Sequence, residues 1–220
     1  MNRIRIKVCG ITRQADAHAA VHFGVDALGF IFVKKTPRYI APDSARAIIK
    51  TLPPFITRVG VFVNSPMDAV QEIVSRSGLT QVQLHGNESI EYCDELKSWN
   101  RSLTICKVFR IGSDRIPTHV SGYDQAIDCV LLDTFIKGAD GGTGEIFDWN
   151  LIQGLSLKKP LILAGGLSLE NVEEAVRKVV PYGIDINSGV EDEPGKKNPQ
   201  LIEKLISKVR HAEKDLRDQQ

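Results

Sequence analysis

Two side chains that can exchange protons follow runs of apolar residues in this sequence. Cys9 follows the run Ile4–Val8, and Asp133 follows the run Cys129–Leu132. A thiol and a carboxyl group at one site could act as base and acid in a proton-transfer reaction. Both residues also have structural interpretations, because a single cysteine often packs as a small apolar residue and a strand-end aspartate often caps a helix. The two residue types alone leave these interpretations open.

Glycine-rich segments form a second candidate feature, an anion site. Gly165 and Gly166 precede Ser168, which we expect to cap a helix over Leu169–Val179. Backbone N–H groups can approach a phosphate closely where side chains are missing, and a helix N-terminus favours negative charge. The segment Gly141–Gly144 could also bind phosphate, and a solvent-exposed loop without a ligand is an equal alternative for it.

Short β-branched runs alternate with helical stretches along the chain. The predicted strands are Ile4–Val8, Ala27–Phe32, Thr57–Phe62, Gln81–Leu84, Leu103–Phe109, Cys129–Leu132, Leu161–Ala164 and Gly183–Ile186. The predicted helices are Arg13–Phe23, Pro42–Leu52, Pro66–Ser77, Ser89–Trp99, a weak one near Ile116–Ser121, Trp149–Gly154, Leu169–Val179 and Gln200–Asp215. Ser65 with Pro66 is a candidate helix start, and Gly24 and Gly78 are candidate helix ends.

This alternation predicts an α/β protein with a parallel sheet, and eight units can close into a (β/α)8 TIM barrel. A doubly wound open sheet is the alternative, but no G-x-G-x-x-G follows the first strand. A chain of 220 residues is short for a barrel, so units five and six should be abbreviated. We expect one barrel domain over 1–220, with 211–220 a frayed, charged end.

Strand periodicity predicts which side chains face the barrel interior. Side chains alternate along a strand, so the faces opposite the apolar ones should point inward. These interior residues are Lys7, Cys9, Gln83, His85, Asp185 and Asn187. Strands one and eight are neighbours in a closed barrel, so we expect a buried Lys7–Asp185 ion pair beneath the site. We also expect Lys7 to favour the thiolate of Cys9, because a nearby cation lowers a thiol pKa.

Composition narrows the classes of function. Lysine and arginine number 28 against 27 acidic residues, and aromatic residues are 6%, which argues against nucleic-acid binding. We expect neither a signal peptide nor a membrane span, and therefore a cytoplasmic protein with reduced thiols. Cys93, Cys106 and Cys129 should be core residues, and Lys196-Lys197 a solvated pair. His18 and His22 lack the acidic residue of a metal motif, so we expect no metal.

Motifs spread from Lys7 to Lys197 allow a family to be suggested. They are Lys7–Thr12, Leu28–Phe32, Pro37–Ile40, Val59–Asn64, Val82–Gly86, Leu131–Thr134, Gly142–Gly144, Phe147–Trp149, Ala164–Leu167 and Ser188–Glu191. In this order and at this spacing, the sequence resembles phosphoribosylanthranilate isomerases of tryptophan biosynthesis. The resemblance implies a (β/α)8 barrel and an Amadori rearrangement of N-(5-phosphoribosyl)anthranilate to 1-(2-carboxyphenylamino)-1-deoxyribulose 5-phosphate. Thr36 and Asn198 depart from the serine and aspartate that many relatives have.

The resemblance also implies roles for individual residues. Cys9 corresponds to the general base and Asp133 to the general acid. The substrate-binding residues it implies are Arg38, Gln83 and His85, and the phosphate-binding residues are Gly142, Gly144, Gly165, Gly166, Ser188 and Gly189. It implies no metal and no organic cofactor, because side chains carry out both proton transfers.

Other functions and assemblies stay open at this point. A pentose-phosphate epimerase is the nearest enzymatic alternative, but its metal ligands cannot be assembled here. A barrel that only binds a sugar phosphate or a partner is the non-catalytic alternative, and retention of Cys9, Asp133 and Arg38 argues against it. A second activity on an aminoaldose of histidine biosynthesis is a further alternative, but its two-phosphate substrate would need a second anion site that the sequence does not show. We expect a small phosphosugar substrate, no nucleic-acid or membrane partner, and a monomer or a homodimer.

Overall fold

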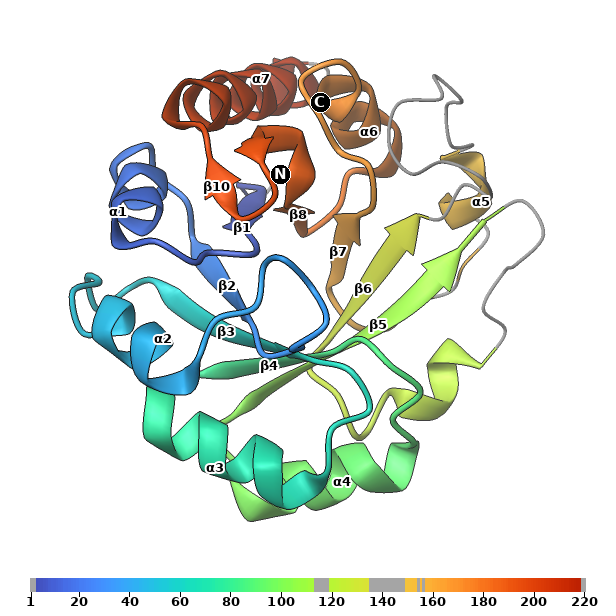
Figure 1. Cartoon of the computed structure of the whole chain (residues 1–220). Helices are drawn as coiled ribbons and strands as arrows, with labels where there is room; N and C mark the ends of the chain where they lie inside the picture. Colours follow the sequence, from blue (N-terminus) through green and yellow to red (C-terminus); the bar gives the residue numbers. More distant parts are fainter. Residues whose placement is uncertain (1–2, 113–118, 135–148, 154, 156, 219–220) are drawn as a thin grey trace.

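The barrel closes as the strand count predicts. The computed structural model describes residues 3–112, 119–134, 149–153, 155 and 157–218. Eight parallel strands pair in sequence order, and β8 pairs with β1 to complete a closed barrel, seen nearly along its axis in Figure 1. The strands are β1 (Arg5–Val8), β2 (Ala27–Ile31), β3 (Thr57–Phe62), β4 (Gln81–Leu84), β5 (Thr104–Ile111), β6 (Cys129–Thr134), β7 (Leu161–Ala164) and β8 (Gly183–Ile186).

Helices surround the barrel (Figure 1). They are α1 (Gln14–His22), α2 (Pro42–Ile49), α3 (Met67–Ser77), α4 (Ile90–Trp99), α5 (Asn150–Gln153), α6 (Val172–Val179) and α7 (Pro199–Asp218), with short 3₁₀ helices η1 (Val120–Tyr123) and η2 (Ser188–Val190). Within the described residues, the helical segments of units five and six are the four-residue η1 and α5. An antiparallel hairpin of β9 (Glu191–Glu193) and β10 (Lys196–Lys197), which the sequence did not predict, precedes α7.

The register of β1 and β8 agrees with the predicted assignment of side chains to the hydrophobic core or to the barrel interior. Ile6 lies opposite Ile184 and Lys7 lies opposite Asp185. The side chains of Ile6 and Ile184 belong to the main hydrophobic core, which fills the space between strands and helices. The alternate residues therefore point into the barrel, as expected for strands whose side chains alternate.

Several helix boundaries differ from those expected, and three of the differences have a clear structural reason. Pro66 is itself the N-cap of α3 rather than its first helical residue. Helix α6 begins only at Val172, because Ser168 engages Glu170 and Asn171 through hydrogen bonds instead of capping a helix. Helix α7 continues to Asp218 and buries Ala212 and Glu213, so the expected frayed segment is helical as far as it is described.

The predicted helix ends at Gly24 and Gly78 are confirmed. Gly78 is the C-cap of α3 and has a left-handed backbone, with φ of 75°. Gly24 follows the C-cap of α1 and has φ of 90°. Glycine has no Cβ to clash in this conformation, which is why it ends helices so often.

Candidate active site

A cavity at the carboxyl ends of the strands brings the predicted acid and base together. Its volume is about 230 Å³, and its lining is Cys9, Ile31, Val61, Gln83, His85, Leu131, Asp133, Ala164, Gly165, Gly166, Leu167, Asp185, Asn187 and Ser188. Cys9 directly follows β1, and Asp133 lies near the end of β6. This is the end of a (β/α)8 barrel at which active sites are found.

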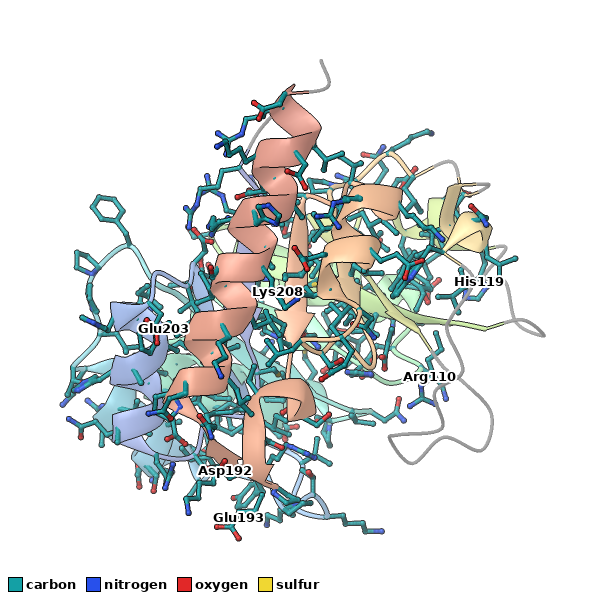
Figure 2. The ribbon with its side chains drawn as sticks, turned by 90° about the horizontal axis from the view of Figure 1, so that it is seen from above. Arg110, His119, Asp192, Glu193, Glu203 and Lys208 are labelled. Atoms are coloured by element: carbon teal, nitrogen blue, oxygen red, sulfur yellow. The ribbon has the colours of Figure 1, made fainter. Side chains whose placement is uncertain are left out.

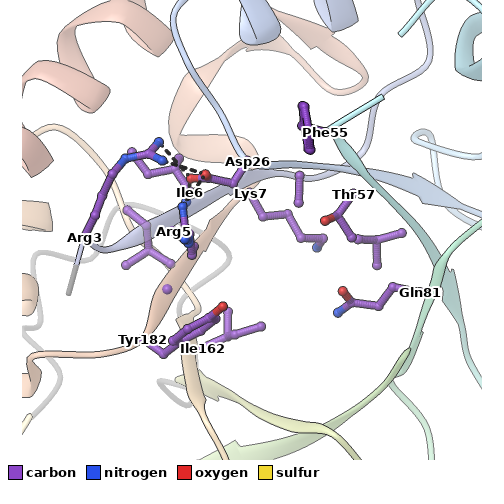
Figure 3. A pocket seen from close by; sticks show the side chains of 14 residues that line it. Arg3, Arg5, Ile6, Lys7, Asp26, Phe55, Thr57, Gln81, Ile162 and Tyr182 are labelled. Carbon is purple, nitrogen blue, oxygen red and sulfur yellow. Dashed lines mark hydrogen bonds and ion pairs between the residues drawn. The ribbon is translucent and has the colours of Figure 1, made fainter. Parts of the chain in front are cut away.

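A larger cavity opens at the opposite mouth of the barrel and has a different character (Figure 3). Its volume is about 480 Å³, and Arg3, Arg5 and Asp26 form ion pairs at its rim. Phe55 borders it and is 96% exposed. Neither Cys9 nor Asp133 lines this larger cavity. The smaller cavity at the carboxyl ends of the strands is therefore the candidate active site.

The predicted ion pair beneath the site is present. The Lys7 ammonium lies 2.5 Å from a carboxylate oxygen of Asp185, and both side chains are buried. Burial alone would lower the pKa of Lys7, but the negative charge of Asp185 raises it above its ordinary value. Lys7 is therefore a cation inside the barrel.

Lys7 favours the thiolate of Cys9 as expected, but burial acts in the opposite direction and is the larger effect. Burial raises the pKa of Cys9 above its ordinary value, and the nearby Asp185 carboxylate raises it further. Lys7 lowers this pKa, as the sequence predicts, and Lys197 acts in the same direction. Desolvation of the thiolate outweighs both cations, so the resting thiol of Cys9 holds its proton.

A chain of polar contacts reaches from the ion pair to Asp133. The Lys7 ammonium donates to Oε1 of Gln83 at 2.8 Å. Nε2 of Gln83 lies 3.5 Å from Nδ1 of His85, and Nε2 of His85 lies 3.1 Å from Oδ2 of Asp133. Of the two residues implied as substrate-binding, His85 therefore contacts the candidate acid directly, and Gln83 reaches it through His85.

Arg38 lies beside this cavity rather than in its lining. Its Nε and Nη2 donate to the buried carboxylate of Glu191 at 2.7 to 3.1 Å. The Lys197 ammonium also donates to Glu191, at 2.7 Å, and to Asn187. Burial raises the pKa of Glu191, but hydrogen bonds from Arg38 and Lys197 lower it below its ordinary value. One carboxylate therefore anchors two cations next to the site.

The glycine segments after β7 and β8 approach the cavity closely. Gly165 and Gly166 line it with φ of 88° and 60°, a backbone that favours glycine. A Cβ on Gly189 would lie 2.1 Å from the carbonyl oxygen of Leu167, so the loops after β7 and β8 can pack together only with glycine here. The implied phosphate residues Gly142 and Gly144 lie outside the described residues.

Sequence reasoning missed several residues of this region. Asp185 was expected as the partner of Lys7, but the residue also lines the cavity, and its buried Oδ1 has no hydrogen-bond partner among the described residues. Lys197 is 1% exposed instead of solvated, because it pairs with Glu191. This burial results from pairing within the β9–β10 hairpin. No local pattern indicated it, because the charged residues around Lys197 are typical of an exposed turn.

The described residues offer neither a metal cluster nor a membrane span. Among them, no group of three or more histidine, cysteine, aspartate or glutamate side chains is arranged to hold a metal ion. Within the same residues, every helix is too short or too polar to cross a bilayer.

Comparisons with known proteins identify the family. The family model described as N-(5'-phosphoribosyl)anthranilate (PRA) isomerase matches residues 6–208. The N-(5'-phosphoribosyl)anthranilate isomerase of Pseudomonas fluorescens is 46% identical over 212 residues, covering 96% of this chain and 100% of that protein.

Solved structures agree with this match. A phosphoribosyl anthranilate isomerase in complex with reduced 1-(o-carboxyphenylamino)-1-deoxyribulose 5-phosphate is 38% identical, with a TM-score of 0.84, covering 94% of this chain and 99% of the other. A structure of monomers generated from the dimeric Thermotoga maritima enzyme is 36% identical, with a TM-score of 0.82, covering 94% and 98%. The chain belongs to the phosphoribosylanthranilate isomerase family.

Proposed function

We propose that Cys9 is the general base and Asp133 the general acid of this isomerase. As a member of its family, the chain is an enzyme of tryptophan biosynthesis that isomerises N-(5'-phosphoribosyl)anthranilate to 1-(2-carboxyphenylamino)-1-deoxyribulose 5-phosphate. The observation that carries the role assignment is that one cavity at the carboxyl ends of the strands is lined by both Cys9 and Asp133.

The reaction requires two proton transfers that these groups can supply. Asp133 protonates the furanose ring oxygen, the bond from that oxygen to C1 breaks, and the nitrogen lone pair forms a Schiff base. Cys9 as thiolate then removes the proton from C2, and the electron pair of that bond moves to give an enolamine. The enolamine takes a proton at C1 and loses one from its C2 hydroxyl to become the ketone. Atoms and electrons balance without a metal, an oxidant or an organic cofactor.

The surroundings of Cys9 suit a base whose thiol is protonated at rest. Its burial raises the thiol pKa, and the positive charges of Lys7 and Lys197 counteract this increase. A desolvated thiolate is a stronger base than a hydrated one, because its pKa is higher. The two cations reduce the energetic cost of forming it next to Asp185.

Two anionic groups of the substrate need partners. We assign the phosphate to the backbone of Gly165, Gly166 and Gly189 with the hydroxyl of Ser188, joined by Gly142 and Gly144. Arg38 binds the anthranilate carboxylate, because a guanidinium can form paired N–H bonds with a carboxylate. In the described part of the chain, Nη1 of Arg38 makes no hydrogen bond, while Nε and Nη2 are held by Glu191.

The test is the loss of anthranilate fluorescence when chelator-treated enzyme meets freshly made substrate. Cys9→Ala and Asp133→Asn should each lower kcat by about 10²-fold to 10⁴-fold, because each removes one proton-transfer group. Cys93→Ala is the matched control, since Cys93 is buried in α4 away from the cavity. Activity near that of the wild type in either variant would refute the corresponding role.

The proposal also covers the cellular location, the partners and the oligomeric state of the enzyme. The enzyme works in the cytoplasm on a small phosphosugar, without nucleic-acid or membrane partners, which agrees with its balanced charge and with the four free thiols. It is a monomer or a homodimer, and one Thermotoga maritima relative is described as dimeric. Sedimentation velocity distinguishes the two states.

A further inference from the structure

We propose that Lys7 and Gln83 fix the tautomer of His85, and that His85 thereby selects the oxygen of Asp133 that releases the proton. Gln83 and His85 are then positioning residues that act through Asp133. The inference rests on the proposed function, because it gives Asp133 the role of acid. Four side chains determine the directions of the hydrogen bonds, one after another, in the order Lys7, Gln83, His85 and Asp133.

The first step is the orientation of the Gln83 amide. The Lys7 ammonium has only hydrogens to offer, and it lies 2.8 Å from Oε1 of Gln83. Lys7 and Gln83 are 5% and 3% exposed, so water cannot relieve a mismatch. A flipped amide would place its NH₂ group against the ammonium, which would leave donors facing donors. The ion pair with Asp185 keeps Lys7 charged and therefore keeps this orientation.

The second step is the position of the ring proton on His85. With Oε1 of Gln83 bound to Lys7, the NH₂ group of Gln83 is the part that faces Nδ1 of His85, at 3.5 Å. This contact is long, but only an Nδ1 without a proton can accept it. A neutral imidazole then carries its proton on Nε2.

The third step is the effect on Asp133. The Nε2–H group of His85 donates to Oδ2 of Asp133 at 3.1 Å. Because Oδ2 accepts this hydrogen, the acidic proton of Asp133 resides on Oδ1, the oxygen left for the substrate. After the proton has moved to the ring oxygen, the same N–H group holds the new carboxylate charge. Hydrogen bonds to charged groups contribute about 1.5–3 kcal/mol, equal to about tenfold to hundredfold in rate.

The primary experiment reads the tautomer directly. The protein is labelled with ¹⁵N-histidine, and the His85 signals are assigned by their loss in His85→Gln among the five histidines of the chain. At mildly alkaline pH, the wild type should show a protonated Nε2 and an unprotonated Nδ1. A proton on Nδ1 would overturn the proposal without reference to activity. Asp133→Asn activity equal to the wild type would instead refute the proposed role of Asp133 as acid, whichever tautomer the spectrum shows.

Gln83→Met tests the role of the amide in catalysis. Methionine has a similar length but cannot donate to Nδ1, so the His85 signals should move toward a mixture of tautomers. We expect kcat to fall in proportion to the fraction of His85 that has lost its Nε2 proton, with little change in KM. Gln81→Met is the matched control, because Gln81 lies on the same strand, two residues earlier, and lines the opposite cavity (Figure 3). A shifted tautomer with unchanged kcat would overturn the proposal.

A second pair of variants separates hydrogen bonding from packing. His85→Gln retains an N–H donor near the position of Nε2, whereas His85→Leu retains only bulk. We expect the glutamine variant to keep at least tenfold more of the wild-type kcat than the leucine variant. Equal losses in both would show that His85 only fills space, which would overturn the proposal.

Discussion

The thiol of Cys9 lies between groups that pull its pKa in opposite directions. Burial and the carboxylate of Asp185 raise this pKa, while Lys7 and Lys197 lower it. The fraction of thiolate should therefore rise only as the pH increases through the alkaline range. The charges that set this balance come from β1 and β8 and from the hairpin, so substitutions remote from the substrate can move it.

Two substitutions should move the Cys9 pKa in opposite directions. Lys7→Met removes a cation and should raise the pKa further, whereas Asp185→Asn removes an anion and should lower it. The measurement is the pH dependence of Cys9 alkylation by iodoacetamide, followed by mass spectrometry of its peptide. The double variant controls for an unpaired charge in the core. An unchanged Cys9 pKa in Lys7→Met would contradict the electrostatic role of Lys7.

At the scale of elements, the hairpin of β9 and β10 connects Arg38 to the barrel. Its Asp192 and Glu193 lie at one end of the molecule, near the start of α7 (Figure 2). Glu191, at the start of β9, is buried and binds both Arg38 and Lys197. The hairpin therefore fixes the guanidinium that we assign to the anthranilate carboxylate.

Glu191→Gln should weaken both stability and substrate binding. It leaves the buried Lys197 without a counter-charge, which should cost about 3 kcal/mol near neutral pH, and it should raise KM by releasing Arg38. The pKa of Glu191 is lower in the folded protein than its ordinary 4.5, so its contribution is present above that value and is lost as pH falls below it. Urea unfolding at about pH 7 and about pH 4 should show the difference shrinking.

Glu193→Gln is the control for this prediction. Glu193 belongs to the same hairpin but is exposed, and its ion pair within the described part of the chain is with Lys196, at 3.5 Å. Exposed pairs contribute about 0–1 kcal/mol, so this variant should unfold almost as the wild type does. Equal destabilisation by the two variants would mean that the hairpin, and not the buried carboxylate, is responsible.

Local patterns predicted the elements well and their long-range contacts poorly. Apolar alternation located every barrel strand to within two residues, and alternation between β1 and β8 predicted the Lys7–Asp185 pair. The hairpin was missed because its residues are charged and are stabilised by Arg38, far away in sequence. The bond between His85 and Asp133 joins β4 to β6 and has no local signature.

At the scale of the whole molecule, the last helix secures the first strand. The carboxylate of Glu213 is buried and accepts a hydrogen bond from the backbone N–H of Ile4. Arg210 donates to the carbonyl oxygen of Ile4 at 2.9 Å and to Glu213 at 2.8 Å. Both ends of the chain thus meet where β1 enters the barrel, so the closure of β1 against β8 depends on α7.

Removal of residues 211–220 should therefore destabilise the entire barrel. It leaves the N–H of Ile4 without its buried acceptor, and buried unsatisfied groups cost about 1–3 kcal/mol each. Glu213→Ala alone should lower the free energy of unfolding by about 2 kcal/mol, measured by urea unfolding, while Glu213→Gln keeps an acceptor and should lose less. Removal of 217–220 is the control, because it spares Glu213. If the longer truncation unfolded at the wild-type urea concentration, the end of α7 would be the dispensable tail that its charged sequence suggests.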